Sequence, residues 1–191
     1  MSAFPQDHLI DALWPAGDDG HAFAVLDGAR DPRVHALVPA SPLPHRCLYL
    51  GALPAPLARA APWLVQLSRG SPATRKILSA AWGRSWGILA RARVPLPEMH
   101  RHLRRFLRVR DERGRTLLFR YYDPRVFRVY LPTCTEDELA LVFGPVETYL
   151  MEAEDPARLL TFRHAQGELK AADATYSQPL PWHKDYLRAS R

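Results

Sequence analysis

Short apolar runs that end at proline or glycine limit what this chain can fold into. The sequence has 191 residues, among them 18 prolines and 10 glycines. No apolar run reaches the ~18 residues that a transmembrane helix needs. Aliphatic and aromatic runs predict strands over residues 23–26, 47–50, 63–67, 84–91, 116–122, 146–152 and 159–163. Periodicity and capping residues predict helices over residues 7–13, 32–37, 54–61, 72–82, 97–108, 124–130 and 135–144.

This alternation predicts an α/β or α+β fold, in which helices pack on a mixed β-sheet. We expect one compact domain over residues 21–164, with residues 116–122 in its central sheet. Residues 1–20 are expected to form an N-terminal segment that contains a short helix. Residues 165–191 are polar and interrupted by proline, and are expected to form a C-terminal tail.

Two helices carry clear boundary signals. Ser71 is a suitable N-cap, Pro72 suits the first helical position, and Gly83 suits a terminator just past the helix. Thr135 and Glu138 have the spacing of a capping box, in which each side chain accepts from the other residue's backbone amide. We therefore expect one helix to begin after Ser71 and another after Thr135.

The positive charge is concentrated in one part of the chain. The formal net charge is +6, and residues 91–128 hold 12 arginines against 4 acids, so this window carries +8 and the rest −2. A basic patch of this kind suits a nucleic acid, and it suits the acidic surface of another protein equally well.

The helix expected over residues 97–108 is amphipathic. Its apolar side chains and its arginines fall on opposite faces: Met99, Leu103, Phe106 and Leu107 on one, and Arg101, Arg104, Arg105 and Arg108 on the other. The basic stripe is either a solvated outer face or a docking surface for an acidic partner. Like charges at this spacing repel, and an acidic partner would relieve that repulsion.

The segment over residues 119–125 ends an apolar run with the helix-opening pair Asp–Pro. Asp123 is expected to cap the next helix and Pro124 to fix its first φ angle, with Arg120 or Arg125 paired to Asp123. The alternative interpretation is that these four residues contact a partner.

Motifs for catalysis and metal binding are missing from the sequence. There is no glycine-rich phosphate loop, no H-E-x-x-H, no G-x-S-x-G and no C-x-x-C. His100 and His102 are two apart on a predicted helix and cannot jointly bind a metal, so we expect flanking positions on the helix. Cys47 and Cys134 are expected to be packed thiols. We expect no cofactor, no metal and no catalytic residues, although a hydrolase with scattered catalytic residues remains an alternative.

The compartment is also constrained. The first eleven residues lack the basic start and apolar block of a secretory signal. Two cysteines are too few for a disulfide framework, which favours a reducing compartment. We therefore expect a cytoplasmic protein that does not bind a membrane.

Several runs of this sequence resemble the signature of type VI secretion adaptor proteins. They are Leu-Arg-Arg-Phe-Leu at 103–107, Asp-Glu-Arg-Gly at 111–114, Leu-Phe-Arg-Tyr-Tyr-Asp-Pro-Arg-Val at 118–126 and Leu-Val-Phe-Gly-Pro-Val at 141–146. Weaker pieces precede them in the same order, and the similarity spans about residues 22 to 152. The block at 120–125 is the specific part.

The resemblance implies a bacterial cytoplasmic chaperone of the Tap or Tec type. Such a protein is not an enzyme: it binds one secreted effector and loads it onto a VgrG spike protein. The resemblance places the family motif at Arg120, Asp123, Pro124 and Arg125, which makes them candidate partner-binding residues beside the basic stripe. Some relatives have a longer C-terminal lobe, whereas we expect only a tail after residue 164 here.

The alternatives are a general protein-interaction domain and a nucleic-acid-binding module. A module of the second kind would carry exposed aromatic side chains among its arginines, because bases stack on aromatic rings. Phe106, Phe119 and Phe127 fall at positions that we expect to be buried, which makes nucleic acid the less favoured partner.

Overall fold

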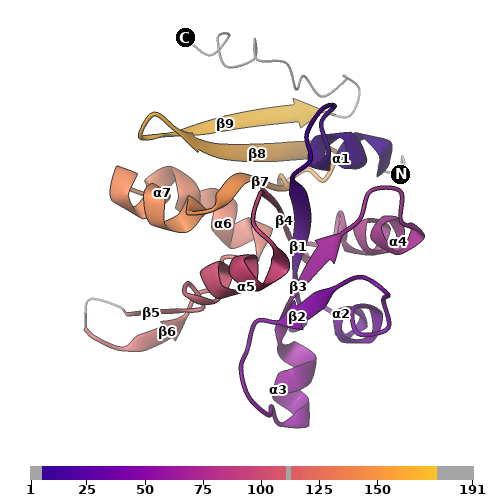
Figure 1. Cartoon of the computed structure of the whole chain (residues 1–191). Helices are drawn as coiled ribbons and strands as arrows, with labels where there is room; N and C mark the ends of the chain where they lie inside the picture. The colour runs from indigo at the N-terminus through magenta and orange to yellow at the C-terminus, as the bar shows by residue number, and fades with distance from the viewer. Residues whose placement is uncertain (1–5, 111–112, 176–191) are drawn as a thin grey trace.

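A seven-stranded β-sheet lies between two layers of helices in the computed structural model, which describes residues 6–110 and 113–175 (Figure 1). The strands are β1 (His21–Asp27), β2 (His45–Cys47), β3 (Pro62–Leu67), β4 (Gly87–Ala92), β7 (Val146–Glu152), β8 (Arg158–Ala165) and β9 (Glu168–Thr175). Their order in the sheet is β2-β3-β1-β4-β7-β8-β9. The sheet expected as mixed is antiparallel at each of its six pairings.

The helices divide between the two faces of the sheet. They are α1 (Gln6–Leu13), α2 (Pro32–Leu37), α3 (Ala55–Ala60), α4 (Pro72–Ala81), α5 (Leu96–Arg104), α6 (Pro124–Tyr130), the 3₁₀ turn η1 (Leu131–Thr133) and α7 (Glu136–Phe143). One apolar core holds the buried side chains of α5, α6 and α7, and the other holds those of α1, α2 and α4. Within the described ranges, no helix is both long enough and apolar enough to cross a membrane.

Strand β1 contributes side chains to both apolar cores, one on each face of the sheet. Phe23 and Val25 point into the core under α5–α7, whereas Ala22, Ala24 and Leu26 point into the core under α1, α2 and α4. Successive side chains of a strand alternate between faces, so a strand that is apolar at every position is buried on both. The expected fold class, a sheet with helices packed on it, is therefore confirmed.

A close approach between β1 and β4 requires a glycine. Gly87 pairs with Leu26, and a Cβ atom at position 87 would lie 1.9 Å from the carbonyl oxygen of Val25. No side chain fits at that distance, so this part of the sheet depends on Gly87.

The boundary signals of the two marked helices are confirmed. The Ser71 hydroxyl accepts from the amide of Ala73 at the start of α4. Thr135 and Glu138 form the reciprocal capping box of α7, with Oγ1 of Thr135 3.3 Å from the amide of Glu138. The short helix expected near the N-terminus is also present, and it buries Leu9 and Leu13 against the sheet.

Residues 116–122 are not part of the central sheet, and that prediction is wrong. Only Thr116–Leu118 forms a strand, β6, which pairs with β5 (Arg108–Arg110) in a separate hairpin. Tyr121 and Tyr122 are instead buried in the core under the helices, so burial of aromatic rings overrode their strand propensity.

Three further boundaries differ from expectation. The strand expected over residues 47–50 is β2, His45–Cys47, which shares only Cys47 with that range. Helix α5 ends at Arg104 with Arg105 as its C-cap, not near residue 108. Residues 168–175, expected within the tail, form strand β9, which pairs with β8 along eight residues. Residues 176–191 of the expected tail lie outside the described residues.

Candidate functional site

The motif residues meet at the end of β1, where Arg120 links two buried carboxylates. Its Nη2 atom lies 2.5 Å from Oδ2 of Asp27 and 3.4 Å from Oδ2 of Asp123. Both aspartate side chains are at most 3% exposed, whereas the side chain of Arg120 is 40% exposed, although its Nε atom is buried. Asp27 is the last residue of β1 and also accepts from the amide of Ala29. The ion pairs therefore fasten the start of α6 to the sheet.

Asp123 is the N-cap of α6, as the sequence predicts. Its Oδ1 atom accepts from the backbone amide of Arg125 at 3.0 Å, and Arg125 also donates to the carboxylate from Nε and Nη2 at 2.9 and 2.6 Å. Burial raises the pKa of Asp123, but the hydrogen bonds and charges of Arg125 and Arg120 outweigh burial and hold this pKa below its usual value. Pro124 is buried at the first helical position.

The same Asp-Pro-Arg-Val sequence occurs a second time, at residues 31–34, where it begins α2. Asp31 caps α2 and pairs with Arg33 at 2.6 Å, just as Asp123 pairs with Arg125. Arg33 holds the pKa of Asp31 at about 2. The local arrangement is therefore a general way to begin a helix, and the bridge from Arg120 to Asp27 is what distinguishes the copy at residues 123–126.

A cluster of aromatic rings lies under the motif. Tyr121 is fully buried, donates from its hydroxyl to the carbonyl of Leu103 at 2.9 Å, and contacts the rings of Phe106 and Phe127 edge-on. Burial, the charge of Tyr49 and a hydrogen bond with it raise the pKa of Tyr122. These contacts join α5, α6 and the segment between them into one rigid unit.

These contacts give all four motif residues a structural role. Asp123 and Pro124 are buried, so of these four residues only Arg120 and Arg125 reach the surface, with side chains that are 40% and 44% exposed. The sequence predicted the cap and the local pairing correctly. It did not indicate Asp27, which lies 93 positions from Arg120 along the chain. Contact of this cluster with a partner stays a prediction.

The four arginines of the expected stripe do not share one helical face. Arg101 and Arg105 are exposed, but Arg104 is half-buried and donates from Nε to the carbonyl of Leu48 at 3.0 Å. Because α5 ends at Arg104, Arg108 is in strand β5 of the hairpin. The stripe is therefore shorter than expected, and the remaining basic residues extend onto the hairpin.

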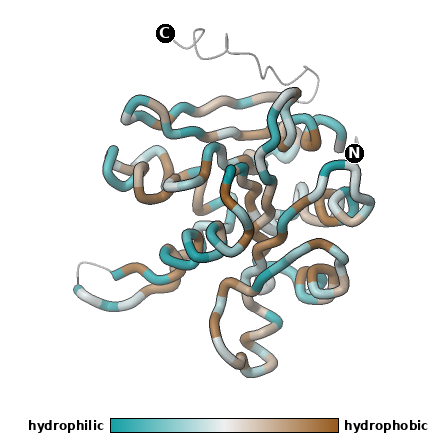
Figure 2. Tube along the Cα trace, in the orientation of Figure 1, coloured by the Kyte–Doolittle hydropathy of each residue, from teal (hydrophilic) through white to brown (hydrophobic). Residues whose placement is uncertain are grey.

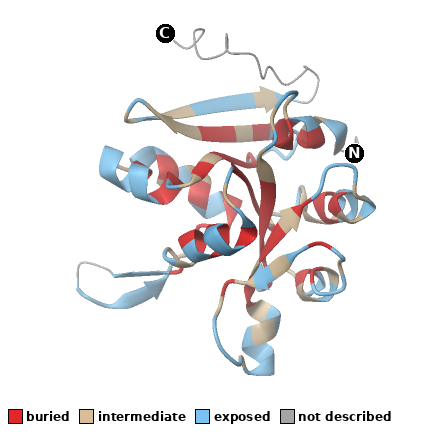
Figure 3. Cartoon of the chain, in the orientation of Figure 1, coloured by how far each residue is buried: buried red, intermediate tan, exposed pale blue. Residues whose placement is uncertain are grey.

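Most of the large exposed apolar side chains belong to the segment that runs from the hairpin to α7. Of the eight large apolar side chains that are exposed in the described part of the chain, six belong to the hairpin, α6 or α7: Val109, Leu117, Leu118, Val126, Val129 and Leu141. Figure 3 shows both strands of the hairpin as exposed, projecting away from the sheet beside α5. We call this region, from α5 through the hairpin to α7, the basic–apolar surface.

The candidate metal and thiol residues are engaged in packing. His100 and His102 are buried, not flanking, and their Nε2 atoms bond the carbonyls of Cys47 and Val142 at 2.8 and 3.0 Å. Burial raises the pKa of the thiols of Cys47 and Cys134. Within residues 6–110 and 113–175, no group of three or more metal-ligating side chains occurs.

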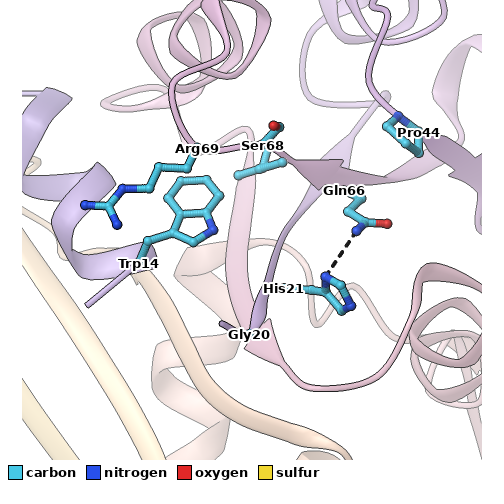
Figure 4. A pocket seen from close by; sticks show the side chains of 8 residues that line it. Trp14, Gly20, His21, Pro44, Gln66, Ser68 and Arg69 are labelled. Atoms are coloured by element: carbon cyan, nitrogen blue, oxygen red, sulfur yellow. Dashed lines mark hydrogen bonds between the residues drawn. The ribbon is translucent and has the colours of Figure 1, made fainter. Parts of the chain in front are cut away.

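A shallow pocket of about 380 Å³ lies at the opposite end of β1, among α1, β1 and β3 (Figure 4). Trp14, His21, Gln66 and Arg69 line it, together with Gly20, Pro44, Leu67 and Ser68. The Gln66 amide donates to Nδ1 of His21 at 3.3 Å, which engages that imidazole nitrogen. The pocket is far from the motif residues in the fold and does not add to the basic–apolar surface.

Comparison of the chain with curated proteins and with solved structures found no match. A family model described as a domain of unknown function, DUF4123, matches residues 22–141. That range begins in β1, contains Asp27 and all four motif residues, and ends within α7. It covers well over half of the chain, and the chain therefore belongs to the DUF4123 family.

Proposed function

We propose that this protein is a non-enzymatic cytoplasmic chaperone that binds a type VI secretion effector and loads it onto a VgrG spike protein. The observation that carries the proposal is the basic–apolar surface, which lies almost wholly in the segment matched by the family model. The resemblance of residues 103–126 to type VI secretion adaptors covers the same elements. A surface with both arginines and exposed apolar side chains is suited to binding another protein.

The four motif residues, together with Asp27, would hold the elements of this surface in place. Arg120 fastens α6 to the end of β1, and Tyr121 fastens the same segment to α5. Rigid positioning reduces the conformational entropy lost on binding, so the exposed residues on α5, α6 and the hairpin can contribute more to affinity.

Nucleic acid is the less favoured partner of the same arginines. Phe127 is buried, and Phe106 and Phe119 are half-buried against Tyr121 and other aromatic rings. The large exposed apolar side chains of the described residues are all aliphatic. Single-strand binding usually relies on exposed aromatic rings, so electrostatic contact alone would have to supply the affinity.

The test is affinity capture of the tagged protein from the cytoplasm of its native cells, after nuclease treatment. We expect two partners at stoichiometric levels, a VgrG spike protein and one large effector, identified by mass spectrometry. Capture of nucleic acid without either protein would contradict the proposal. The purified protein should also stay at background in esterase, phosphatase, protease and nuclease assays, and turnover lost on one substitution in the pocket would contradict the non-enzymatic role.

A further inference from the structure

The β5–β6 hairpin is a two-stranded ribbon whose six paired residues are all exposed. Side chains directly opposite each other share a face, so Val109 and Leu117 lie on one face, and Arg108, Arg110 and Leu118 lie on the other with Thr116. Each face therefore presents leucine to solvent. Figure 2 shows hydrophilic and hydrophobic positions interspersed along this ribbon.

The residues at the base of the ribbon pack against the core, although both of its strands are exposed to solvent. Leu107 is buried, and its carbonyl accepts from the amide of Phe119 at 3.0 Å. The ring of Phe119 packs edge-on against the ring of Tyr130, the last residue of α6, with the ring centroids 4.8 Å apart. A two-stranded hairpin has little stability of its own in water. This hairpin is held in place by the contacts of Leu107 and Phe119 at its base, and its apolar side chains point away from the core.

Charge indicates what would cover the ribbon. Arg108 and Arg110 share one face of the ribbon with Leu118, and exposed Arg101 and Arg105 lie on the neighbouring α5 and at its C-cap. A second copy of this chain would bring the same arginines together, and like charges in an interface disfavour that pairing. A protein surface with carboxylates around apolar side chains would match both the arginines and the leucines.

We infer that the hairpin is a docking element, and that its occupant is an acidic polypeptide segment that also carries apolar side chains. The inference deepens the proposed function, on which it rests for the identity of the occupant as cargo. The leucines would supply most of the affinity, because burying them removes apolar surface from water. The arginines would accelerate association and select acidic segments over others.

A direct binding experiment needs no knowledge of the natural partner. The probe is a short fluorescein-labelled peptide of glutamate, aspartate and leucine, compared by anisotropy with the same peptide in which every acid is the amide. We expect the acidic peptide to bind the wild type, more weakly at about 300 mM than at about 50 mM salt, and the amide peptide to bind less. The double variant Leu117→Ser, Leu118→Ser should lose affinity roughly tenfold, the usual effect of removing well-buried interface side chains.

Matched controls separate the hairpin from general effects. Leu57→Ser on α3 removes a leucine that is 45% exposed, as Leu117 is, and should leave binding unchanged. For the charges, Arg108→Glu with Arg110→Glu is compared with Arg69→Glu with Lys76→Glu, which makes the same charge change on the far side of the sheet. Absence of peptide binding, or equal loss in the hairpin variants and their controls, would overturn the inference. Equal melting temperatures show that the variants are folded.

The same variants in the native capture experiment distinguish this inference from the proposed function. If the wild type captures neither spike nor effector, the proposed function fails, and the peptide experiment still decides the hairpin's role. If the wild type captures its effector and the hairpin variants capture it equally, the docking role fails while the function stands. If the wild type and the control variants capture the effector and the hairpin variants do not, both the proposed function and the docking role are supported.

Discussion

Replacing Asp123 by alanine should destabilise the protein by about 2 to 3 kcal/mol. Loss of the helix cap alone costs about 1 kcal/mol, which is the effect that the sequence predicts. The structure adds charge-assisted hydrogen bonds from Arg125 and Arg120 to a carboxylate that is 3% exposed. Such bonds contribute about 1.5 kcal/mol or more each when buried. Both arginine side chains are 40% or more exposed, so water can replace part of what is lost, and we count the two ion pairs together as only about 1 to 2 kcal/mol.

Asp123→Asn separates the cap from the charge. The amide oxygen can still accept from the backbone amide of Arg125, so we expect a loss of stability of about 1 to 2 kcal/mol, from the ion pairs alone. Asp31→Ala is the matched control, because Asp31 caps α2 and pairs with Arg33 in the same way but lacks the link to a second buried carboxylate. Its effect should be smaller than that of Asp123→Ala.

Urea unfolding followed by tryptophan fluorescence measures all three variants, since the free energy of unfolding extrapolates linearly to water. The pKa of Asp123 is below its usual value in the folded protein, so its contribution is complete above the unfolded-state value of about 4. That contribution is lost as the pH falls through the lower, folded-state pKa. The difference in free energy of unfolding between wild type and Asp123→Asn should be constant from pH 8 to about pH 5 and should become smaller below about pH 4. A loss under about 0.5 kcal/mol for Asp123→Ala would refute the reasoning.

Three other substitutions test features of the fold and the surface. Gly87→Ala should cost roughly 3 kcal/mol, seen as a melting temperature lower by about 6 to 12 °C, because its Cβ would lie 1.9 Å from the carbonyl oxygen of Val25; an unchanged melting temperature would contradict the close approach. Thr135→Ala should cost about 1 kcal/mol through loss of the capping box of α7, and Thr135→Ser should restore most of it. Arg101→Glu with Arg105→Glu should slow association with an acidic partner at low salt without changing stability, and salt-independent association at the wild-type rate would leave these arginines as solvated side chains.

The sequence predicted best where a structure is decided by neighbouring residues. Ser71–Pro72 and the pair Thr135 and Glu138 begin helices because their hydrogen bonds close within three residues. The strands β1, β3, β4 and β7 were also predicted, because each is a short run of aliphatic and aromatic residues bounded by proline, glycine or polar residues. These four strands hold most of the residues of the sheet, and the two helices are one from each helix layer.

The errors arose where distant contacts decide. Residues 119–122 have high strand propensity, but Tyr121 donates to Leu103, and its ring is needed in the core between α5 and α6. Strand β9 is mostly exposed and rich in alanine and charged residues, so only its pairing with β8 identifies it. The partner of Arg120 is Asp27, and no local pattern connects a strand end to a residue 93 positions later.

The order of the strands bears on how this protein could be divided. Strand β7 pairs with β4 in the middle of the sheet, yet it begins at residue 146, beyond the family match that ends at 141. A chain trimmed to the matched residues would leave one edge of β4 without its neighbour and would remove Tyr149 and Met151 from the core. Unpaired strand edges and uncovered apolar surface promote aggregation. The smallest unit that folds alone should therefore extend at least through β8, and the boundary of sequence similarity is not the boundary of the folding unit.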